Sequence, residues 1–492
     1  MSTPPRTQGA VYFSIVRPSS LVLGLGLGLA SAVVPACYHP EPLNPRAMMN
    51  ELRQADAAGG APPVGPPGSP APLHLPEGTA LGEDRSVALA LLWNRDLRAF
   101  RLTRGIAAGE VISAGALANP ELRMELTHLQ RRDLSQLGWD VRLSWEPPRP
   151  GVRAGRIGAA SARLDEVEYQ VREREWDLTC DVRSAHAALV AIDEEIRVAQ
   201  DTIANRQRLA DAVSRRVAKG GTTRFDLDLV RLSLASAEHA ESQRRLERTL
   251  AASALAHLVG VGAPGGAVTV SGRLDEVAGD AAFPGQVELE DRALGNRAAV
   301  AATEARHRAS EETLRAEIAA RWPWFRLAAA PRVRRNEIFG ATTDVVLGLD
   351  VILPILDTNR GRVLSAEAAR DKARADVATT LSGLRVDIAR ALAAVEAQRS
   401  ILRHLEAQVG PLLVEHDRVL TLAAQALELD LPALISSENL VLASRIELIV
   451  ARLELRKAWI ALERAVGSRV TPASPSTSRL AIPPPLEPES GK

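Results

Sequence analysis

The stretch "QLGWDVRLSWEPP", residues 136–148, decides the fold because apolar and charged side chains alternate along it. The apolar set is Trp139, Val141, Leu143 and Trp145, and the polar set is Asp140, Arg142, Ser144 and Glu146. Successive side chains of a strand point to opposite faces. The pattern therefore predicts a β-strand with one apolar and one charged face, just before a long, Ala-rich charged run that is typical of a helix.

Three other segments carry a related pattern. "ELRMEL" (121–126) is the expected partner of the first strand, and "WPWFRLAAAPRV" (322–333) and "DVVLGLDVIL" (344–353) are expected to form a second pair. Pro323 must lie near the start of its strand, because proline cannot donate a hydrogen bond to a sheet. We expect strands at about 119–129, 137–147, 322–333 and 343–353. Strands of about ten residues with this alternation are typical of membrane β-barrels.

A membrane location would give these strand residues two roles. The polar positions predicted to face a water-filled lumen are Arg123, Glu125, Asp140, Arg142, Asp344 and Asp350. The tryptophans predicted to form a girdle at the membrane surface are Trp139, Trp145, Trp322 and Trp324. A soluble hairpin packed on a helix is the alternative, and it explains the tryptophans less well. Since unpaired strand edges are forbidden in lipid, four strands require further copies, and three copies would give twelve strands.

After each strand pair, apolar residues recur at alternating spacings of three and four, the seam of a coiled coil. The first seam contains Leu164, Val167, Val171, Leu178, Val182, Ala185, Leu189, Ile192, Ile196, Ala199, Ile203, Ala210, Val213 and Val217. Shifted by about 206 residues, the second contains Val377, Leu384, Ile388, Ala391, Val395, Leu402, Leu405, Val409 and Val419. Arg174 and Arg206 occupy two positions of the first seam. A helix from Gly155 to Ala218 would be roughly 96 Å long.

The common frame of the two seams indicates that one large unit is duplicated. "LVG" (258–260) matches "AVG" (465–467), and "WNRDLRA" (93–99) resembles "GNRAAVA" (295–301). We predict a first unit at 81–265 with helices at about 155–218 and 226–258, and a second at 285–468 with helices at about 361–426 and 432–466. Pro411 should kink the second long helix.

Each long helix is followed by a turn signal, "KGGTTRFDLD" (219–228) or "ELDLPALISSE" (428–438). Thr222 or Thr223 is expected to cap one return helix, and Asp430, followed by Pro432, the other. These tips carry the acids Asp226, Asp228, Glu428 and Asp430. In a trimer, acids that face the axis form a ring that binds cations or closes by bridging to arginines such as Arg224. Simple helix capping by solvated acids is the alternative.

The two ends of the chain differ in composition from the rest. Residues 1–36 carry Arg6, Arg17 and the apolar run "LVLGLGLGLASAVV", which together are typical of an export signal. "VPAC", ending at Cys37, resembles a bacterial lipoprotein site, with cleavage after Ala32 or Ala36 as the alternative. We expect residues 37–80 to be a lipid-anchored, Pro/Gly-rich linker, and residues 469–492 a disordered tail.

Composition and charge narrow the range of functions. The chain has 60 basic and 60 acidic residues, so net charge gives no reason to expect nucleic acid. Apolar residues make up 46% and aromatics only 3%, which favours helices packed through small side chains. The histidines show no metal-ligand spacing, and no motif has the context of a nucleotide site. We therefore expect no enzyme activity, cofactor or metal site, and Cys180 is expected to be a packing residue.

These features together resemble the TolC-like outer-membrane efflux family over about residues 81–468. "ANPELRMEL" (118–126) resembles the entry into the first strand, and "LPILDTNRGRVLSAEAA" (353–369), with Pro354, Asp357, Asn359 and Gly361, resembles the passage into the second long helix. At the first tip, Gly221 and Asp226 occupy the family's Gly-x-x-x-x-Asp positions. At the second tip, the chain has Leu427 where the family often has glycine.

The resemblance implies a homotrimer in the outer membrane of a Gram-negative bacterium. A twelve-stranded barrel would cross the lipid, and a tunnel of long coiled-coil hairpins would cross the periplasm. The tips would dock a periplasmic adaptor and an inner-membrane pump, and the conduit would export small molecules or metal ions. Two alternatives remain at this point: a periplasmic coiled-coil adaptor and a structural lipoprotein.

Overall fold

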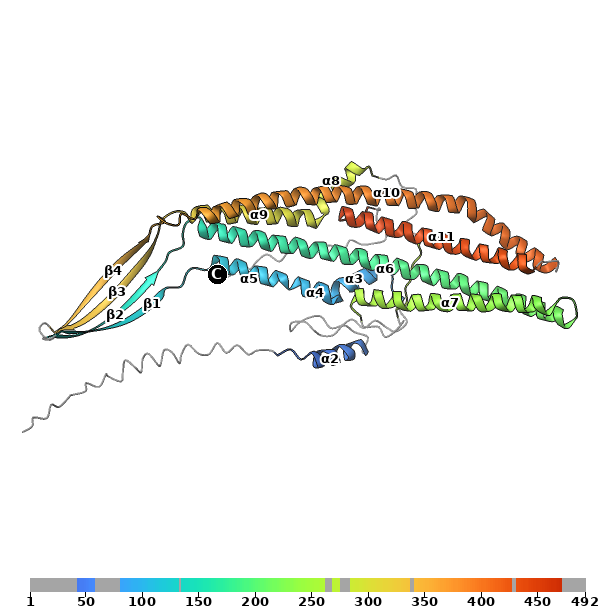
Figure 1. Ribbon diagram of the computed structural model, residues 1–492, viewed down its shortest axis with the longest axis horizontal. Helices are drawn as coiled ribbons and strands as arrows, with labels where there is room; N and C mark the ends of the chain where they lie inside the picture. Colours follow the sequence, from blue (N-terminus) through green and yellow to red (C-terminus); the bar gives the residue numbers. More distant parts are fainter. Residues whose placement is uncertain are drawn as a thin grey trace, which may run out of the picture. The chain divides into compact units, whose positions relative to one another are not determined.

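A computed structural model describes residues 42–57, 80–131, 134–261, 268–274, 284–336, 340–426 and 431–470. Four long helices dominate these residues: α6 (Val152–Ala218), α7 (Arg224–Val259), α10 (Arg360–Ala426) and α11 (Leu431–Val466). The helices α6 and α10 each have 67 residues, and α7 and α11 each have 36. The equal lengths in the two halves are what a duplicated unit requires. Figure 1 shows the long helices running side by side.

Shorter helices precede each strand pair, where none was predicted. They are α3 (Glu83–Trp93), α4 (Arg95–Arg101) and α5 (Thr103–Gly115) in the first half, and α8 (Gln286–Asn296) and α9 (Ala298–Ala319) in the second. Next to the strands, α5, α6, α9 and α10 form one layer in this order, and further along, α7, α6, α11 and α10 do the same. In each half, one long helix is unbroken, α6 or α10. The helices beside it, α5 and α7 or α9 and α11, follow one another in a row that is interrupted.

A glycine in each half allows two helix ends to approach closely: the end of α7 meets the junction of α3 and α4, and the end of α11 meets the junction of α8 and α9. Gly260 ends α7 with φ 83°, and a Cβ there would lie 2.3 Å from the carbonyl oxygen of Trp93. Asn94, between α3 and α4, donates to the carbonyl oxygen of Leu258 at 2.9 Å. Gly467 has φ 78°, and its Cβ would lie 2.8 Å from Cα of Arg297. The two pairs of matching segments seen in the sequence are thus the two helix joints.

The coiled-coil seams form much of the core. On α6 the buried seam residues are Val171, Leu178, Val182, Leu189, Ile196, Ala210 and Val213. On α10 they are Leu384, Ile388, Ala391, Val395 and Leu402. Of the two arginines expected in the first seam, Arg206 is buried and Arg174 is exposed. The helix α10 continues through Pro411 and bends in its last third (Figure 1).

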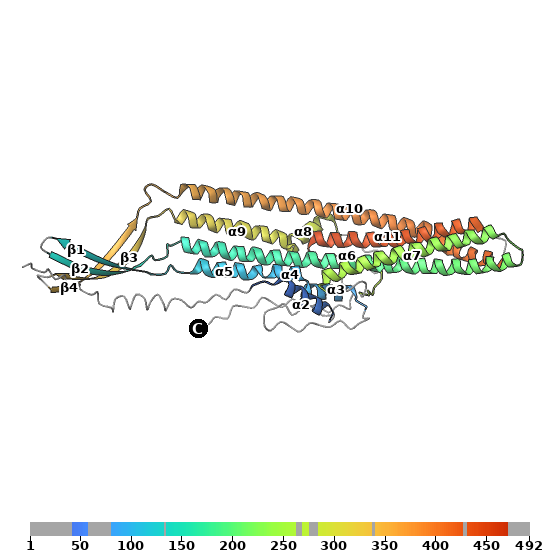
Figure 2. The same ribbon diagram turned by 60° about the horizontal axis from the view of Figure 1, so that its bottom comes forward.

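The strands form a single antiparallel sheet at the end of the helices opposite the C-terminal ends of α6 and α10 (Figure 2). They are β1 (Glu121–Arg131), β2 (Leu134–Trp145), β3 (Trp324–Asn336) and β4 (Gly340–Ile352), in the order β1-β2-β3-β4. Their ends differ from the expected ranges by up to three residues. The two hairpins join through β2 and β3, so the duplicated units share one sheet.

The segment 37–80, expected to be a linker without folded structure, contains the helix α2 (Pro45–Ala57). Asn44 caps it, since its side-chain oxygen accepts from the amides of Arg46 and Ala47 at 3.1 and 3.2 Å. Pro45 occupies the first helical position, where a missing N–H costs nothing. The Pro/Gly-rich composition of the segment comes from residues after the helix, which hid its helix-forming start. Cys37, the predicted lipidation site, lies outside the described residues.

Candidate functional site: sheet faces and helical tips

The strand register places the apolar side chains on one face of the sheet. Leu122, Met124 and Leu126 pair with Leu143, Val141 and Trp139, and Leu327 and Ala329 of β3 pair with Leu349 and Leu347 of β4. Most of these side chains are exposed; Leu347, for example, is 81% exposed. A continuous exposed apolar surface on a sheet of this length is what a lipid-facing sheet presents.

The opposite face collects the charged residues that the sequence predicted for a lumen. Arg123 pairs with Arg142, and Glu125 with Asp140, across β1 and β2. Asp344 and Asp350 pair with Arg332 and Arg326 across β3 and β4. All six predicted residues therefore share one face. Their role as lumen residues stays a prediction.

Two basic residues of this face were missed in the sequence. Arg332 lies 3.7 Å from Asp140, measured from Nε to Oδ2, and Arg326 lies 3.6 Å from Glu146. Both are in β3, whose alternation is obscured by three alanines and Pro331. The polar face therefore carries both signs of charge: like charges lie opposite each other across β1 and β2, and opposite charges across β3 and β4.

The four tryptophans of the predicted girdle do not all lie on the same face of the sheet. Trp139 and Trp145 lie on the apolar face, and Trp145 donates from Nε1 to the carbonyl oxygen of Ala118. Trp324 begins β3 on the polar face, in phase with Arg326, and donates to the carbonyl oxygen of Pro147. Trp322 lies before the strand. The girdle at the membrane surface stays a prediction for these tryptophans, of which Trp324 shares a face with the charged residues.

At the first tip, Asp226 is held by the start of its own helix. Its Oδ2 accepts from the hydroxyls of Thr222 and Thr223, both at 2.6 Å, and from the amide of Thr223 at 3.0 Å. The hydroxyl of Thr223 accepts in return from the amide of Asp226 at 3.2 Å, which completes a capping box. The Thr222 and Thr223 hydrogen bonds hold the pKa of Asp226 below its usual value. This geometry favours the capping alternative for Asp226.

The turn before this cap is closed by glycines. Gly220 has φ 68°, and the amides of Gly220 and Gly221 donate to the carbonyl oxygens of Val217 and Arg216. This is the Schellman arrangement that ends a helix with a left-handed residue. The glycine that the conformation requires is thus Gly220, next to the predicted Gly221. Arg224 and Asp228 are exposed, whereas Glu428 and Asp430 of the second tip lie outside the described residues.

Behind the tip, Arg206 joins the two hairpins. Its guanidinium donates to the carbonyl oxygen of Ser233 on α7 at 2.6 Å and to Oδ1 of Asn439 on α11. Oε2 of Glu438 lies 3.8 Å from Nε of Arg206. Burial raises the pKa of Glu438, and the nearby charges of Arg206 and His416 offset this only in part. The apparent flaw in the first seam is therefore a buried polar contact between the halves.

Within the described residues, side chains that could bind a metal ion do not cluster. These residues contain no group of three or more His, Cys, Asp or Glu side chains placed to hold a metal ion. Cys180 is buried, as expected, and burial raises the pKa of its thiol to about 11. No described helix combines the length and the apolar character needed to cross a membrane.

Comparison with known proteins agrees with this geometry. Residues 87–261 match the family described as "Outer membrane efflux protein". The cobalt-zinc-cadmium resistance protein CzcC of Cupriavidus metallidurans is 24% identical over 357 residues, which cover 72% of this chain and 79% of that protein.

Solved structures show the same fold over both halves. CusC superposes with a TM-score of 0.65 at 16% identity, covering 83% of this chain and 99% of that one. The open MtrE outer membrane channel of Neisseria gonorrhoeae gives 0.64 at 18% identity, covering 78% and 89%.

The expected resemblance is therefore confirmed in two respects: residues 87–261, in the first repeat, match the outer membrane efflux family, and both halves have the fold of CusC and MtrE.

Proposed function

We propose that three copies of this chain form the outer-membrane conduit of a tripartite efflux system. The observation that carries the proposal is the sheet, which has one apolar face and two edges, β1 and β4, that pair with only one strand each. In hydrocarbon each unpaired backbone group costs several kcal/mol. Joining β4 of one copy to β1 of the next removes every edge, and three copies give twelve strands.

The helices support the same arrangement. In the layer, α7 and α10 lie at the two outer positions. Both expose large apolar side chains, among them Leu232 and Leu250 on α7 and Leu364 and Leu412 on α10. Apolar patches of this kind mark interfaces. Neighbouring copies would bury them against each other and close a tunnel, whose tips, with Arg224 and Asp228 exposed, would dock the adaptor and pump.

One substitution tests the trimeric barrel. Leu347→Arg places a charge on the apolar face, whereas Val346→Arg places it on the polar face of the same strand. An arginine that faces lipid costs about 2–4 kcal/mol at the membrane centre. We expect the wild-type chain and Val346→Arg to purify from membranes as detergent-soluble trimers that conduct in planar bilayers. Leu347→Arg should give a strongly reduced trimer yield.

The outcome also separates the alternatives. A Cys37→Ser variant that leaves the membrane without detergent as a monomer would overturn the conduit. It would favour a lipid-anchored scaffold or adaptor. Equal trimer yields for the two arginine variants would instead contradict the assignment of the faces.

The cargo that we propose is divalent metal ions, because the curated relative is a cobalt-zinc-cadmium resistance protein. The test is growth of a Gram-negative strain that keeps a metal-exporting pump and adaptor but lacks its own outer-membrane channel. Expression of this chain should raise the tolerated concentration of zinc, cobalt or cadmium several-fold, with organic toxins as the comparison. Protection against the organic toxins alone would overturn the metal assignment and leave the conduit intact.

A further inference from the structure

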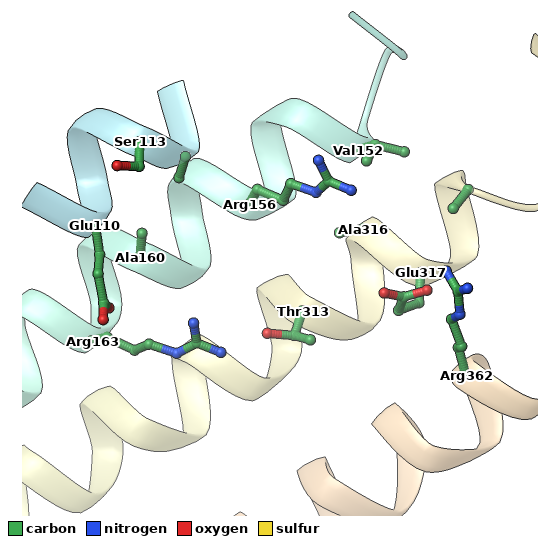
Figure 3. Close-up of a pocket in the computed structure, with 12 residues that line it drawn as sticks. Glu110, Ser113, Val152, Arg156, Ala160, Arg163, Thr313, Ala316, Glu317 and Arg362 are labelled. Carbon is green, nitrogen blue, oxygen red and sulfur yellow. The ribbon is translucent and has the colours of Figure 1, made fainter. Parts of the chain in front are cut away.

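A basic groove lies where the helix layer approaches the sheet. It has a volume of about 360 Å³ and is lined by α5, α6, α9 and α10. Arg156 and Arg163 reach it from α6 and Arg362 from α10, and the acids are Glu110 and Glu317 (Figure 3). Side chains 206 residues apart in the sequence thus converge on one hollow, which no motif in the sequence indicated.

The three arginines of the groove lack protein partners. Within the part of the chain that the structure describes, none of them makes a hydrogen bond or an ion pair. Glu317, in contrast, accepts from Nδ2 of Asn359 at 2.8 Å. Three arginines against two acids leave one excess positive charge per chain. Like charges that share a partly enclosed hollow repel each other, and a bound anion would remove this repulsion.

The groove lies on the side of α6 that faces away from residues 81–83. Arg183 and His186 of α6 contact Glu83 and the carbonyl oxygen of Leu81. At about 100° per residue, these two side chains lie roughly opposite Arg163 around the helix, whereas Arg156 is two turns from Arg163 and shares its face. Because α5, α6, α9 and α10 all line this one hollow, we infer that it lies on the concave side of their layer.

We propose that this groove binds a multivalent oxyanion of the phosphate class that enters the tunnel, a solute distinct from the metal cargo; the bound anion would also offset the repulsion between the arginines and metal cations. In the trimer of the proposed function, on which this step rests, the concave side is the tunnel wall, and three arginines from each of three copies form a belt of nine. Guanidinium groups bind such oxyanions through paired, charge-assisted hydrogen bonds. The belt would attract anions to the tunnel at the point where it meets the barrel.

The test uses trimers in planar bilayers with inorganic pyrophosphate as the probe. We expect pyrophosphate to reduce the wild-type current, and the triple variant Arg156→Gln/Arg163→Gln/Arg362→Gln to need at least about tenfold more of it, as expected for the loss of charge-assisted hydrogen bonds. In a KCl gradient, the reversal potential of the triple variant should shift towards cation preference.

The matched control removes three positive charges from the other side of the same helices. Arg172 of α6, Arg315 of α9 and Arg360 of α10 lie roughly opposite the groove positions. The variant Arg172→Gln/Arg315→Gln/Arg360→Gln should keep the block and the reversal potential of the wild type. If both triple variants behave like the wild type, or both change equally, the groove is not the binding site and the proposal is wrong.

A lipid headgroup shares the phosphate chemistry and must be distinguished. The block is therefore measured in bilayers of phosphatidylcholine alone and with phosphatidylglycerol added. A transported anion predicts the same block in both, whereas relief of the block by phosphatidylglycerol would identify a headgroup site and overturn the proposal. If the wild type does not conduct, the proposed conduit is wrong. Calorimetric titration of the purified chain with pyrophosphate then still tests binding to the groove, because a single chain forms it.

Discussion

Gly260→Ala should destabilise the protein by about 3 kcal/mol or more, one of the two largest effects that we expect. The backbone at Gly260 has φ 83°, a conformation that costs an L-residue about 1–2 kcal/mol. The new Cβ would also lie 2.3 Å from the carbonyl oxygen and 2.6 Å from the carbonyl carbon of Trp93. A backbone group cannot move aside as a flexible side chain can, so the joint between α7 and the start of α4 would have to open.

The measurement is the unfolding midpoint of the purified protein in detergent, followed by circular dichroism. Gly383→Ala is the control, since nothing lies within 4 Å of a Cβ at this position in α10. A helix-interior Gly→Ala change of this kind should stabilise by about 0.5–1 kcal/mol. If Gly260→Ala unfolds at the same temperature as Gly383→Ala, the joint is not the tight contact that the geometry describes.

These joints show where sequence analysis of this chain succeeds and where it stops. The long helices and the strands were predicted because apolar residues recur along each of them at the spacing of a helix or of a strand. The alternation along a strand then predicts which side chains share a face. The matching segments around Gly260 and Gly467 were noticed as a repeat, but their meaning depends on backbone atoms about 165–170 residues away in the sequence. The helices α3, α4 and α8 were missed because each is only 7–11 residues long.

The same limit applies to the candidate site. The predicted lumen residues share one face because every second residue of a strand points to the same side, which the sequence of the strand alone reveals. That Trp324 shares a face with Arg326 and not with Trp139 was not predicted, because relating the faces of β2 and β3 requires the pairing between these two strands. Arg206 appeared as a flaw in a seam, since its partners Ser233 and Asn439 come from two other helices. The arginines of the groove become neighbours only when α6 and α10 pack into one layer.

A second large effect is expected at a buried ionic network that holds the two halves together. Arg183 of α6 contacts Glu463 of α11, and their side chains are only 4% and 2% exposed. Nε of Arg183 also lies 2.7 Å from Oε1 of Glu83 on α3. Removing one member of a buried pair leaves a charge without its partner in a region of low dielectric constant. Glu463→Ala should therefore cost about 3–5 kcal/mol.

The double variant Arg183→Met/Glu463→Leu should cost clearly less than the sum of the two single changes, since both charges of the buried pair are removed together and Glu83 keeps its contact with Arg456. The control is Asp165→Ala, which breaks an exposed contact with Arg308 and should cost no more than about 1 kcal/mol. Unfolding midpoints of the wild type, Arg183→Met, Glu463→Leu and the double variant give the coupling. Strictly additive effects would show that Arg183 and Glu463 do not act as a pair.

Acidification gives an independent view of this network through Glu83. Burial alone would raise the pKa of Glu83, but the charges and hydrogen bonds of Arg456 and Arg183 more than offset it and hold this pKa below its usual value. A lowered pKa means that the contribution of Glu83 to stability is present above the pKa of the unfolded chain and is lost as the pH falls through the folded value. The wild type should thus lose stability on acidification more steeply than Glu83→Gln. Parallel pH profiles of the two proteins would show that Glu83 does not hold α3 to α6 and α11 through its charge.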